Sequence, residues 1–554
     1  MLANLKTPGV YVQEISVLPP AVAAVPTAVP AFVGYTEYDA GDEPIKIANQ
    51  LEYEAVFGRG PRPSVGPLTV DADQAFVSGT ATSTYYLYDA IRLFYANGGG
   101  ECYVVSIGTY ADAVARDDFN AAGAALDRIA LLDEPTLLLF PDAATLPAAD
   151  LGGIQVTALN QCAALQDRFT ICDCRADDPL GSAFRSQIGM SNIKYGAAYT
   201  PWLRARMYRG IDYGVLRGVQ ITLADGSTQT GFAPSGNDEV DALLARYDLV
   251  ADVEDAYAPF LLSGDDTDLT AALDALQAAT DADPAGTPAP VAAARGGLDT
   301  AVGAYGSIPA GDPEQRAAAL VMRGAYTEFR TAVENAYRLE DNLQNLLPLY
   351  RNLVGGLNDL PRAIPPSGAV AGIYARVDGQ RGVWKAPANE SINKVLEPAR
   401  RFTRSELERL NVDTTAGKSI NAIRAFTGKG TLVFGARTLA GNDNENRYVN
   451  VRRLLIFLEE SVRKACEDFV FEPNDANTWL RVRGMIENFL NLQWRAGALQ
   501  GAKAEEAFRV AIGLGQTMTP DDVYNGRMIV EISLAPVRPA EFIVLRFSQL
   551  QAQA

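Results

Sequence analysis

The chain has 554 residues, a formal net charge of −19 and no histidine. A chain of this length exceeds the size of a single hydrophobic core, so roughly two to four domains are expected. The absence of histidine removes the most common general acid–base residue, the Ser-His and Cys-His nucleophile systems and most zinc sites. No other titratable residues form a recognisable catalytic motif, so we expect a protein that is not an enzyme and uses no cofactor.

Charged residues are distributed unevenly along the chain. Residues 366–554 contain 25 Lys and Arg against 21 Asp and Glu, which leaves 23 against 46 for residues 1–365. We expect the acidic N-terminal part to be repelled by nucleic acid, and the C-terminal part to face an acidic protein partner. Five cysteines, an odd number, argue against a disulfide framework and favour folding in a reducing cytoplasm.

The first segment, residues 1–22, has the pattern of one strand followed by a proline-rich linker. Residues 7–15 form the expected strand, and its central residues are Val10, Tyr11, Val12, Gln13, Glu14 and Ile15. No second strand follows it directly, so its backbone must pair with a distant strand or with another chain. Residues 15–35 carry no charge but contain four prolines, which excludes a membrane span.

Between residues 69 and 205, short apolar runs alternate with helical patterns. The pattern predicts helices over 84–95, 117–130 and 151–165, and strands over 102–107, 136–140, 169–173 and 195–199. Such alternation indicates a mostly parallel sheet with helices on both faces. The triple glycine 98–100 precedes a strand instead of joining a strand to a helix, so it lacks the geometry of a phosphate-binding loop. Cys172 and Cys174 have no second ligand pair, so we interpret them as structural thiols.

Residues 206–364 have the composition of an insertion, with no lysine, 11 arginines and 23 acidic residues. Helices are predicted over 238–251, 269–279 and 313–347. The Ala/Gly/Pro-rich stretch 282–310 is predicted to be a flexible loop, because it has few large apolar side chains to offset the entropy of ordering. We expect an acidic decoration on the outside of the protein, and a glycan-binding or carbohydrate-active role is the alternative for this segment.

The most regular amphipathic helix is predicted over residues 450–471. Its apolar side includes Val451, Leu454, Leu455, Leu458 and Val462, and its polar side includes Arg452, Arg453, Arg463 and Lys464. A second helix, 477–494, is expected to turn Leu480, Ile486, Phe489, Leu490 and Trp494 inward. Before these helices, strands are predicted over 420–426 and 431–436, with a turn at 428–430. Residues 417–419 resemble the end of a phosphate-binding loop, but Val412 stands where its first glycine is required.

The chain ends with two predicted strands, 527–534 and 541–548. The residues of the last strand include Phe542, Ile543, Val544, Leu545, Arg546 and Phe547. The linker between them, 535–540, has two prolines and no turn glycine or asparagine, so it is too stiff for a tight hairpin. We expect this linker to hold the last strand away from the rest of its own chain.

A series of short motifs in the second half of the chain resembles contractile tail sheath proteins. The motifs, in order, are PPSGAVAGIYAR (365–376), RGVWKAPANE (381–390), INAIR (420–424), GARTL (435–439), YVNVRR (448–453), FEPND (471–475) and APVRPAEF (535–542). The segment 26–36 is also similar to that family, particularly to its extracellular injection particles. The resemblance therefore covers nearly 200 residues at the C-terminus and one segment near the N-terminus.

The resemblance implies an α/β and α+β multidomain fold. It implies a sheath core domain built from both chain ends, a βα-alternating and mostly parallel sheet domain, and an outer insertion. The expected segments are an N-terminal arm (1–22), a lead-in (23–68), the α/β domain (69–205), the insertion (206–364), the C-terminal sheath core (365–534) and a C-terminal arm (535–554).

The resemblance further implies a structural subunit that polymerises as hexameric rings around an inner tube and contracts to drive the tube through a target envelope. The implied partners are other copies of the chain, the inner tube protein, and baseplate and tail-terminator or cap proteins, without nucleic acid and without membrane insertion. Assembly is expected in the cytoplasm, as part of a phage tail or of a phage tail-like particle. A non-contractile shell or surface-layer protein is the alternative.

The two ends of the chain are then expected to be strands exchanged between neighbouring subunits. Because a helix of this region faces the inner tube in sheath proteins, Arg452, Arg453, Arg463 and Lys464 are the candidate tube contacts. An arginine near a helix start opposes the helix dipole, so for Arg452 and Arg453 an ion pair with a carboxylate of the same or a neighbouring subunit is the alternative.

Overall fold

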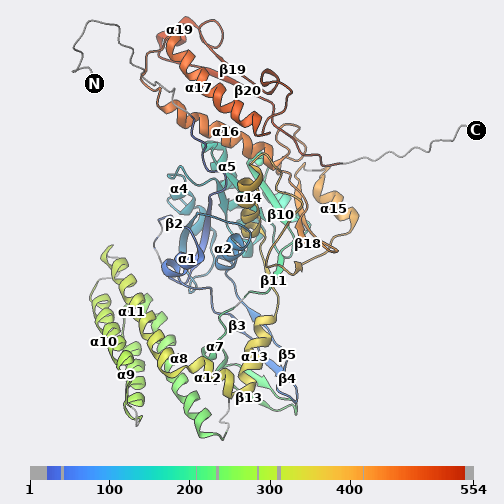
Figure 1. Cartoon of the computed structure of the whole chain (residues 1–554). Helices are drawn as coiled ribbons and strands as arrows, with labels where there is room; N and C mark the ends of the chain where they lie inside the picture. The colour runs from blue at the N-terminus through green and yellow to red at the C-terminus, as the bar shows by residue number, and fades with distance from the viewer. Residues whose placement is uncertain are drawn as a thin grey trace, which may run out of the picture.

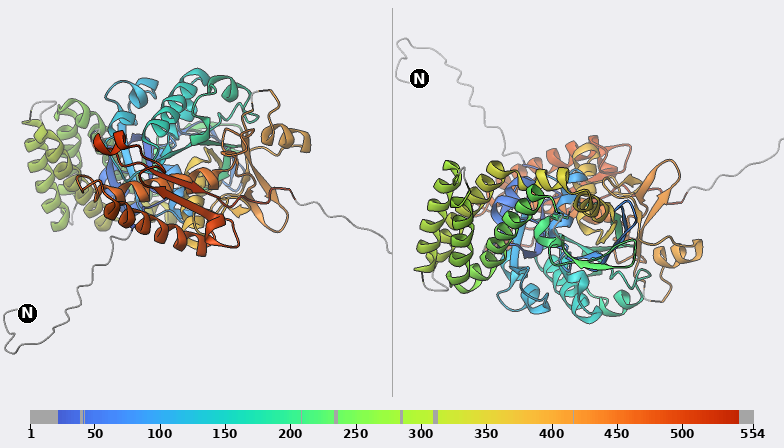
Figure 2. Two further views of the ribbon diagram at one scale, coloured as in Figure 1. Left: turned by 90° about the horizontal axis from the view of Figure 1, so that it is seen from above. Right: turned by 90° about the horizontal axis from the view of Figure 1, so that it is seen from below.

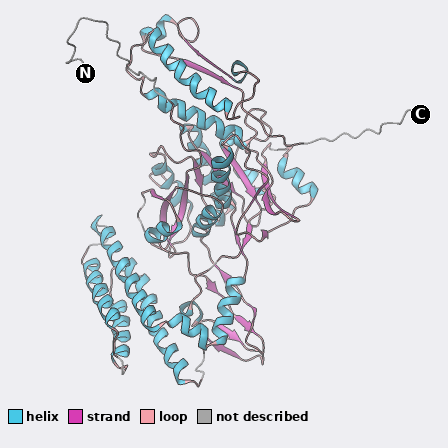
Figure 3. Ribbon diagram, in the orientation of Figure 1, coloured by secondary structure: helices cyan, strands magenta, loops and turns pink. Residues whose placement is uncertain are grey.

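The computed structural model describes residues 22–38, 41, 43–207, 209–232, 236–283, 286–308, 313–415 and 417–542. Figure 1 shows three regions, with an α/β body between a helical insertion and a C-terminal tip. Strands concentrate in the body, whereas long helices dominate the tip and the insertion (Figure 3). The predicted strands 7–15 and 541–548 lie outside the described residues, apart from Glu541 and Phe542.

A nine-stranded sheet forms the centre of the body, in the order β15-β18-β17-β10-β9-β8-β1-β7-β2. The strands are β1 (Pro30–Thr36), β2 (Ile45–Ile47), β7 (Cys102–Thr109), β8 (Leu137–Leu139), β9 (Phe169–Asp173), β10 (Gly196–Thr200), β15 (Glu390–Ser391), β17 (Ile420–Phe426) and β18 (Gly430–Val433). The pairs from β7 through β17 are parallel, and the strands beyond them at both edges are antiparallel. Strands from the predicted segments 23–68, 69–205 and 365–534 therefore share one sheet.

The helices of the body pack on this sheet and on one another. They are α1 (Gln50–Phe57), α2 (Leu87–Ala96), α3 (Arg116–Asn120), α4 (Ala125–Ile129), α5 (Ala148–Leu165), α6 (Ser182–Gln187), α14 (Ser367–Arg381) and α15 (Arg404–Asn411). Helices α2 and α14 approach closely because Gly368 and Gly372 have no side chain. A Cβ atom there would lie 2.2 Å from the carbonyl oxygen of Ala90 and 2.4 Å from that of Phe94. The glycines of the PPSGAVAG motif thus serve helix packing.

The tip has its own apolar core, separate from that of the body. It is built from α16 (Val449–Glu467), α17 (Ala476–Arg495), α18 (Ala504–Ala507), β19 (Phe508–Ile512), α19 (Pro520–Tyr524) and β20 (Val530–Leu534). The two long helices confirm the amphipathic patterns. The prediction for Leu480 is wrong, because Val482, Met485 and Phe489 form the buried stripe of α17 and leave Leu480 71% exposed.

The insertion is a helical bundle with a small sheet. Its helices are α7 (Tyr213–Leu216), α8 (Asp238–Ser263), α9 (Thr267–Asp281), α10 (Ala289–Gly306), α11 (Pro313–Tyr337), α12 (Leu339–Leu346) and α13 (Pro348–Asp359). The sheet joins β12 (Gln220–Thr222) and β13 (Thr228–Thr230) to β4 (Leu68–Val70) and β5 (Phe76–Ser78), so residues ahead of 206 belong to it. Both views in Figure 2 place the green helices at one side of the molecule.

The predicted flexible loop 282–310 is wrong over most of its length, because it contains α10. Alanine is the strongest helix former, and Pro288 and Pro290 stand at the helix start, where proline is tolerated. The apolar side chains recur at helical spacing and are buried in the bundle at Val291, Ala294, Leu298, Ala301, Val302 and Tyr305. Many small apolar residues on one face were therefore enough to order the segment.

Short strands complete the described structure. They are β3 (Ser64–Val65) with β6 (Ala81–Thr82), and β11 (Leu203–Ala205) with β14 (Arg362–Ile364) and β16 (Glu397–Pro398). No helix within the described ranges is long and apolar enough to cross a membrane.

Candidate assembly site

The carboxyl ends of parallel strands, where many α/β sheets bind ligands, are filled here by buried aspartates. Asp142 follows β8 and accepts hydrogen bonds from the backbone N–H groups of Tyr35 (2.7 Å) and Leu87 (3.0 Å), the latter at the start of α2. Asp173 ends β9 and accepts one from the N–H of Ser367 at the start of α14 (3.0 Å). Burial raises the pKa of Asp142 to about 6 and that of Asp173 to about 7, although these hydrogen bonds lower both. The protein's own carboxylates thus accept hydrogen bonds from the first N–H groups of α2 and α14.

A cleft of about 2730 Å³ separates the insertion from the body. Polar contacts join the two regions there: the buried Glu254 of α8 forms ion pairs with Arg62 of the body and with Arg330 of α11. The guanidinium of Arg323 lies 4.2 Å from the ring centre of Tyr38. No group of three or more acidic or cysteine side chains that could hold a metal ion occurs in the part of the chain that the structure describes.

The N-terminal root, defined as residues 22–29, is bound to helices α14 and α16. Arg453 of α16 forms an ion pair with Asp378 of α14 (2.5 Å) and donates to the carbonyl oxygen of Thr27 (2.8 Å). The Thr27 hydroxyl donates to the same Asp378 carboxylate (2.6 Å), and Ser461 of α16 accepts from the N–H of Val25 (3.2 Å). Both charged side chains are almost fully buried. The root is therefore fixed to α16 at two points.

Arg452 and Arg453, which the sequence places on the polar side of α16, are both buried. Arg453 is paired as described above, and the buried Arg452 is paired with Glu459 (2.7 Å) and lies 5.0 Å from the ring centre of Tyr195. The alternative, an ion pair with a carboxylate of the same chain, is what the structure contains for both. Periodicity could not show this, because it does not reveal which charged positions meet a partner element.

Arg463 and Lys464 do lie at the surface of α16, where their side chains are 52% and 36% exposed. Arg463 is paired with Glu460 (2.6 Å) and Glu467 (2.7 Å), and Lys464 lies 3.4 Å from Glu460. The hydrogen bond with Glu460 raises the pKa of Arg463. These two cations therefore belong to a local network of ion pairs with acidic neighbours.

The C-terminal root, defined as residues 535–542, runs along the tip. The carbonyl oxygen of Ala535 accepts from the N–H of Gln500 (2.7 Å), and the N–H of Val537 donates to Ala498 (3.2 Å). The side-chain amide of Asn450, in the first turn of α16, donates to the carbonyl oxygen of Val537 (3.3 Å). The first half of the proline linker is thus bound to the tip of its own chain. The strand that this linker is predicted to hold away lies outside the described residues apart from Glu541 and Phe542.

Near the end of this root lies Glu541, whose carboxylate has three partners. Arg437 donates to it through Nε (2.9 Å) and Nη2 (2.7 Å), Asn411 through Nδ2 (2.8 Å) and Tyr448 through its hydroxyl (3.1 Å). Burial by itself raises the pKa of Glu541, but the hydrogen bonds from Arg437 and Asn411 leave it lowered overall. Phe542, the next residue, is 71% exposed.

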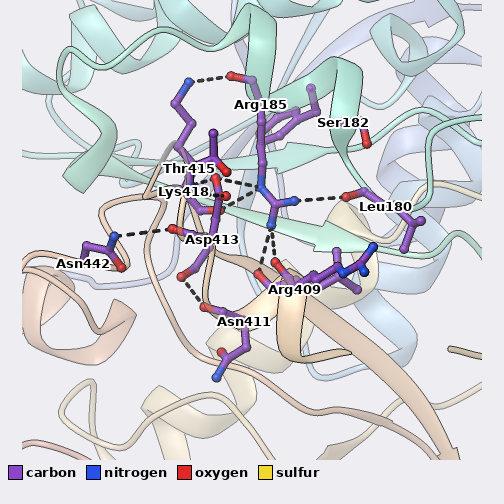
Figure 4. Close-up of polar contacts among 12 residues, drawn as sticks. Leu180, Ser182, Arg185, Arg409, Asn411, Asp413, Thr415, Lys418 and Asn442 are labelled. Carbon is purple, nitrogen blue, oxygen red and sulfur yellow. Dashed lines mark hydrogen bonds and ion pairs between the residues drawn. The ribbon is translucent and has the colours of Figure 1, made fainter. Parts of the chain in front are cut away.

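A polar cluster around Arg185 of α6, drawn in Figure 4, binds the last turn of α15, in which Asn411 lies. Arg185 donates to the carbonyl oxygens of Arg409 (2.9 Å) and Lys418 (2.9 Å) and lies 3.5 Å from the Asp413 carboxylate. The Lys418 ammonium donates back to the carbonyl oxygen of Arg185. The Gly417-Lys418-Ser419 sequence is thus part of a structural loop.

The C-terminal root directly follows β20, which belongs to a two-stranded sheet. Strands β19 and β20 pair with each other in antiparallel register, and no further strand joins them within the described residues. Three half-buried side chains of β20, Val530, Ile532 and Leu534, pack against the core of the tip. Unpaired backbone groups at a sheet edge are a template for another strand.

Comparison with known proteins points to one family. The model of the phage tail sheath C-terminal domain matches residues 442–549. The tail sheath protein of Vibrio phage KVP40 is 26% identical over 236 residues, which are 40% of this chain and 32% of that protein. The tail sheath protein of Enterobacteria phage T4 is 22% identical over 224 residues, again 40% and 32%. The chain thus spans about a third of the length of these relatives.

Solved structures extend the likeness to the whole chain. A chain in the baseplate of the anti-feeding prophage is 26% identical, with 99% of this chain and 100% of that one covered and a TM-score of 0.54. A chain in the contracted helical sheath of the same particle is 25% identical, with 98% and 99% covered and the same TM-score. The body, the insertion and the tip therefore all have counterparts in these chains.

Proposed function

The chain is related to contractile tail sheath proteins, and on that premise we propose that it is the structural subunit of a contractile sheath. It polymerises as hexameric rings around an inner tube and shortens to drive the tube through a target envelope. Its partners are further copies of itself, the tube protein, and the baseplate and terminator or cap proteins. Assembly takes place in the cytoplasm, and the product is part of a phage tail or of a phage tail-like particle.

The observation that carries this proposal is the position of the two roots. Both are fixed to α16, and the predicted strands 10–15 and 542–547 to which they lead lie outside the described residues apart from Phe542. The open sheet of β19 and β20 belongs to the same tip. Neighbouring copies are thus able to supply the missing strands to this sheet.

The exchanged strands are residues 10–15 and 542–547. Each added strand forms about four backbone hydrogen bonds, each with a net contribution of about 0.5–1.5 kcal/mol. One such contact is weak, but a subunit gives and receives several of them, so the lattice stays connected when the bodies rotate. Contraction is a change between two packings of the same subunit and needs neither catalysis nor a cofactor.

Electron microscopy of the protein with and without its tube partner tests the proposal. We expect extended tubes that enclose the partner and, after mild denaturant or acid, shorter and wider empty tubes. Closed shells or flat lattices would instead support the non-contractile shell protein.

A further inference from the structure

Helix α16 is common to both roots. Arg453 and Ser461 hold the N-terminal root, whereas Tyr448, at the start of the helix, and Asn450 hold the C-terminal root. Residues 448 and 461 lie roughly 20 Å apart along a helix that rises 1.5 Å per residue. A single rigid element therefore separates the two points of departure.

The contacts at both roots restrict direction as well as position. A bidentate pair between a guanidinium and a carboxylate fixes the relative orientation of its partners, which a single hydrogen bond does not. Arg437 binds Glu541 in this way, and both nitrogens of Arg453 reach Asp378, which also accepts from Thr27. The arginines and Asp378 are nearly inaccessible to water, so salt screens these pairs much less than surface pairs.

We propose that Glu541 and Asp378 are positioning residues, which set the direction in which the two arms leave α16 and make this helix the strut that carries load between neighbouring subunits. The inference rests on the proposed sheath function.

Arms without these contacts still pair with neighbours, but they leave the body at variable angles. The extended lattice, which requires one geometry at every subunit, is then lost in favour of irregular or contracted polymers.

Two variants test this inference: Glu541→Gln removes the contact of the C-terminal root with Arg437, and Thr27→Ala removes the contact of the N-terminal root with the Asp378 carboxylate. Both keep the buried arginines. Glu408→Gln is the matched control, because Glu408 forms an exposed ion pair with Arg404 on the nearby α15. In the free subunit, chymotrypsin cleavage after Phe542 requires Glu541 to leave Arg437. We expect Glu541→Gln to speed this cleavage about tenfold, and circular dichroism checks that the body stays folded although Arg437 loses its charged partner.

Each variant is then assembled with the tube protein and imaged. We expect a several-fold smaller fraction of extended, tube-filled particles for Glu541→Gln and Thr27→Ala, with a wider spread of subunit twist, and wild-type values for Glu408→Gln. If both root variants show the wild-type fraction of extended particles and the wild-type spread of subunit twist, the inference is overturned but the proposed function is not. A wild-type protein that forms no tubes would instead overturn the proposed function and the inference with it.

Discussion

Arg437 and Glu541, 104 positions apart in the sequence, meet through two hydrogen bonds of 2.9 and 2.7 Å. Arg437 belongs to the GARTL motif, and Glu541 to the APVRPAEF motif. A third motif, YVNVRR, supplies Tyr448 to the same carboxylate. Three of the seven C-terminal motifs that carry the family resemblance therefore meet at the Glu541 carboxylate, beside the start of the proposed C-terminal arm.

The first prediction concerns acid. The pKa of Glu541 is lowered in the folded chain, so its contact with Arg437 is stabilising above the unfolded value of about 4.5 and is lost as the pH falls through the folded value. A dye attached at the C-terminus should therefore gain rotational mobility below about pH 4.5, measured by fluorescence anisotropy. Glu541→Gln should show high mobility at every pH. If the dye on the wild-type protein is highly mobile at every pH, the contact between Glu541 and Arg437 does not hold the C-terminal root.

The second prediction concerns the arms. Deletion of residues 1–15 should leave a folded subunit, because the described core and its root contacts begin at residue 22. It should not form contractile sheath, since each copy then lacks one exchanged strand. Circular dichroism checks the fold, and electron microscopy checks the assembly. Contractile particles of normal length from the deletion variant would rule out strand exchange through this end.

The third prediction concerns helix α10 of the insertion, which lies where the sequence predicted a flexible loop. Leu298 of α10 is completely buried, so Leu298→Ala should destabilise the bundle by about 2–5 kcal/mol. Thr300→Ala, on the exposed side of the same helix, should change stability by no more than about 0.5 kcal/mol. Chemical denaturation with hydrogen exchange resolved by region measures both. Equal stability of the two variants would show that α10 does not pack as described.

The fourth prediction concerns the buried carboxylate at the end of β8. Asp142→Ala leaves the N–H groups of Tyr35, Tyr86 and Leu87 without their acceptor inside the core. An unsatisfied buried donor costs about 1–3 kcal/mol, so the loss of unfolding free energy should be about 3 kcal/mol or more. Asp112→Ala, at an exposed turn, is the control. A loss below about 1 kcal/mol would indicate that water replaces the carboxylate.

Much of the fold could be predicted from the sequence. The strand 169–173 and the amphipathic helix around residues 450–467 follow from local periodicity alone. The nine-stranded sheet could not be predicted as one unit, because β17 pairs with β10 across more than 200 residues and no local pattern encodes such a pairing. The same limit applies to the roots, where Glu541 appears in the sequence as the first residue of a strand and its partners Asn411, Arg437 and Tyr448 are distant.

The last prediction concerns the tube. An extended sheath must hold its tube and release it during contraction, which favours numerous exposed ion pairs of about 0–1 kcal/mol each, all sensitive to salt. Arg463 and Lys464 are the two candidate cations on α16 that remain at the surface. Their pairs with Glu460 and Glu467 must open or be shared when a tube carboxylate approaches, so each contact is weaker than that of an isolated cation.

We therefore expect Arg463→Glu with Lys464→Glu to polymerise directly into the contracted form without enclosing tube. The reversal also removes the ion pairs with Glu460 and places like charges beside it. The variant Glu460→Gln shows what the loss of these ion pairs does by itself, because it leaves both cations in place. It should keep the tube. Arg481→Glu with Arg483→Glu, on the exposed face of α17, controls for the change in net charge. Co-expression with the tube protein and imaging distinguish the cases, and extended, tube-filled sheaths of the first variant at the wild-type frequency would show that the tube is held elsewhere.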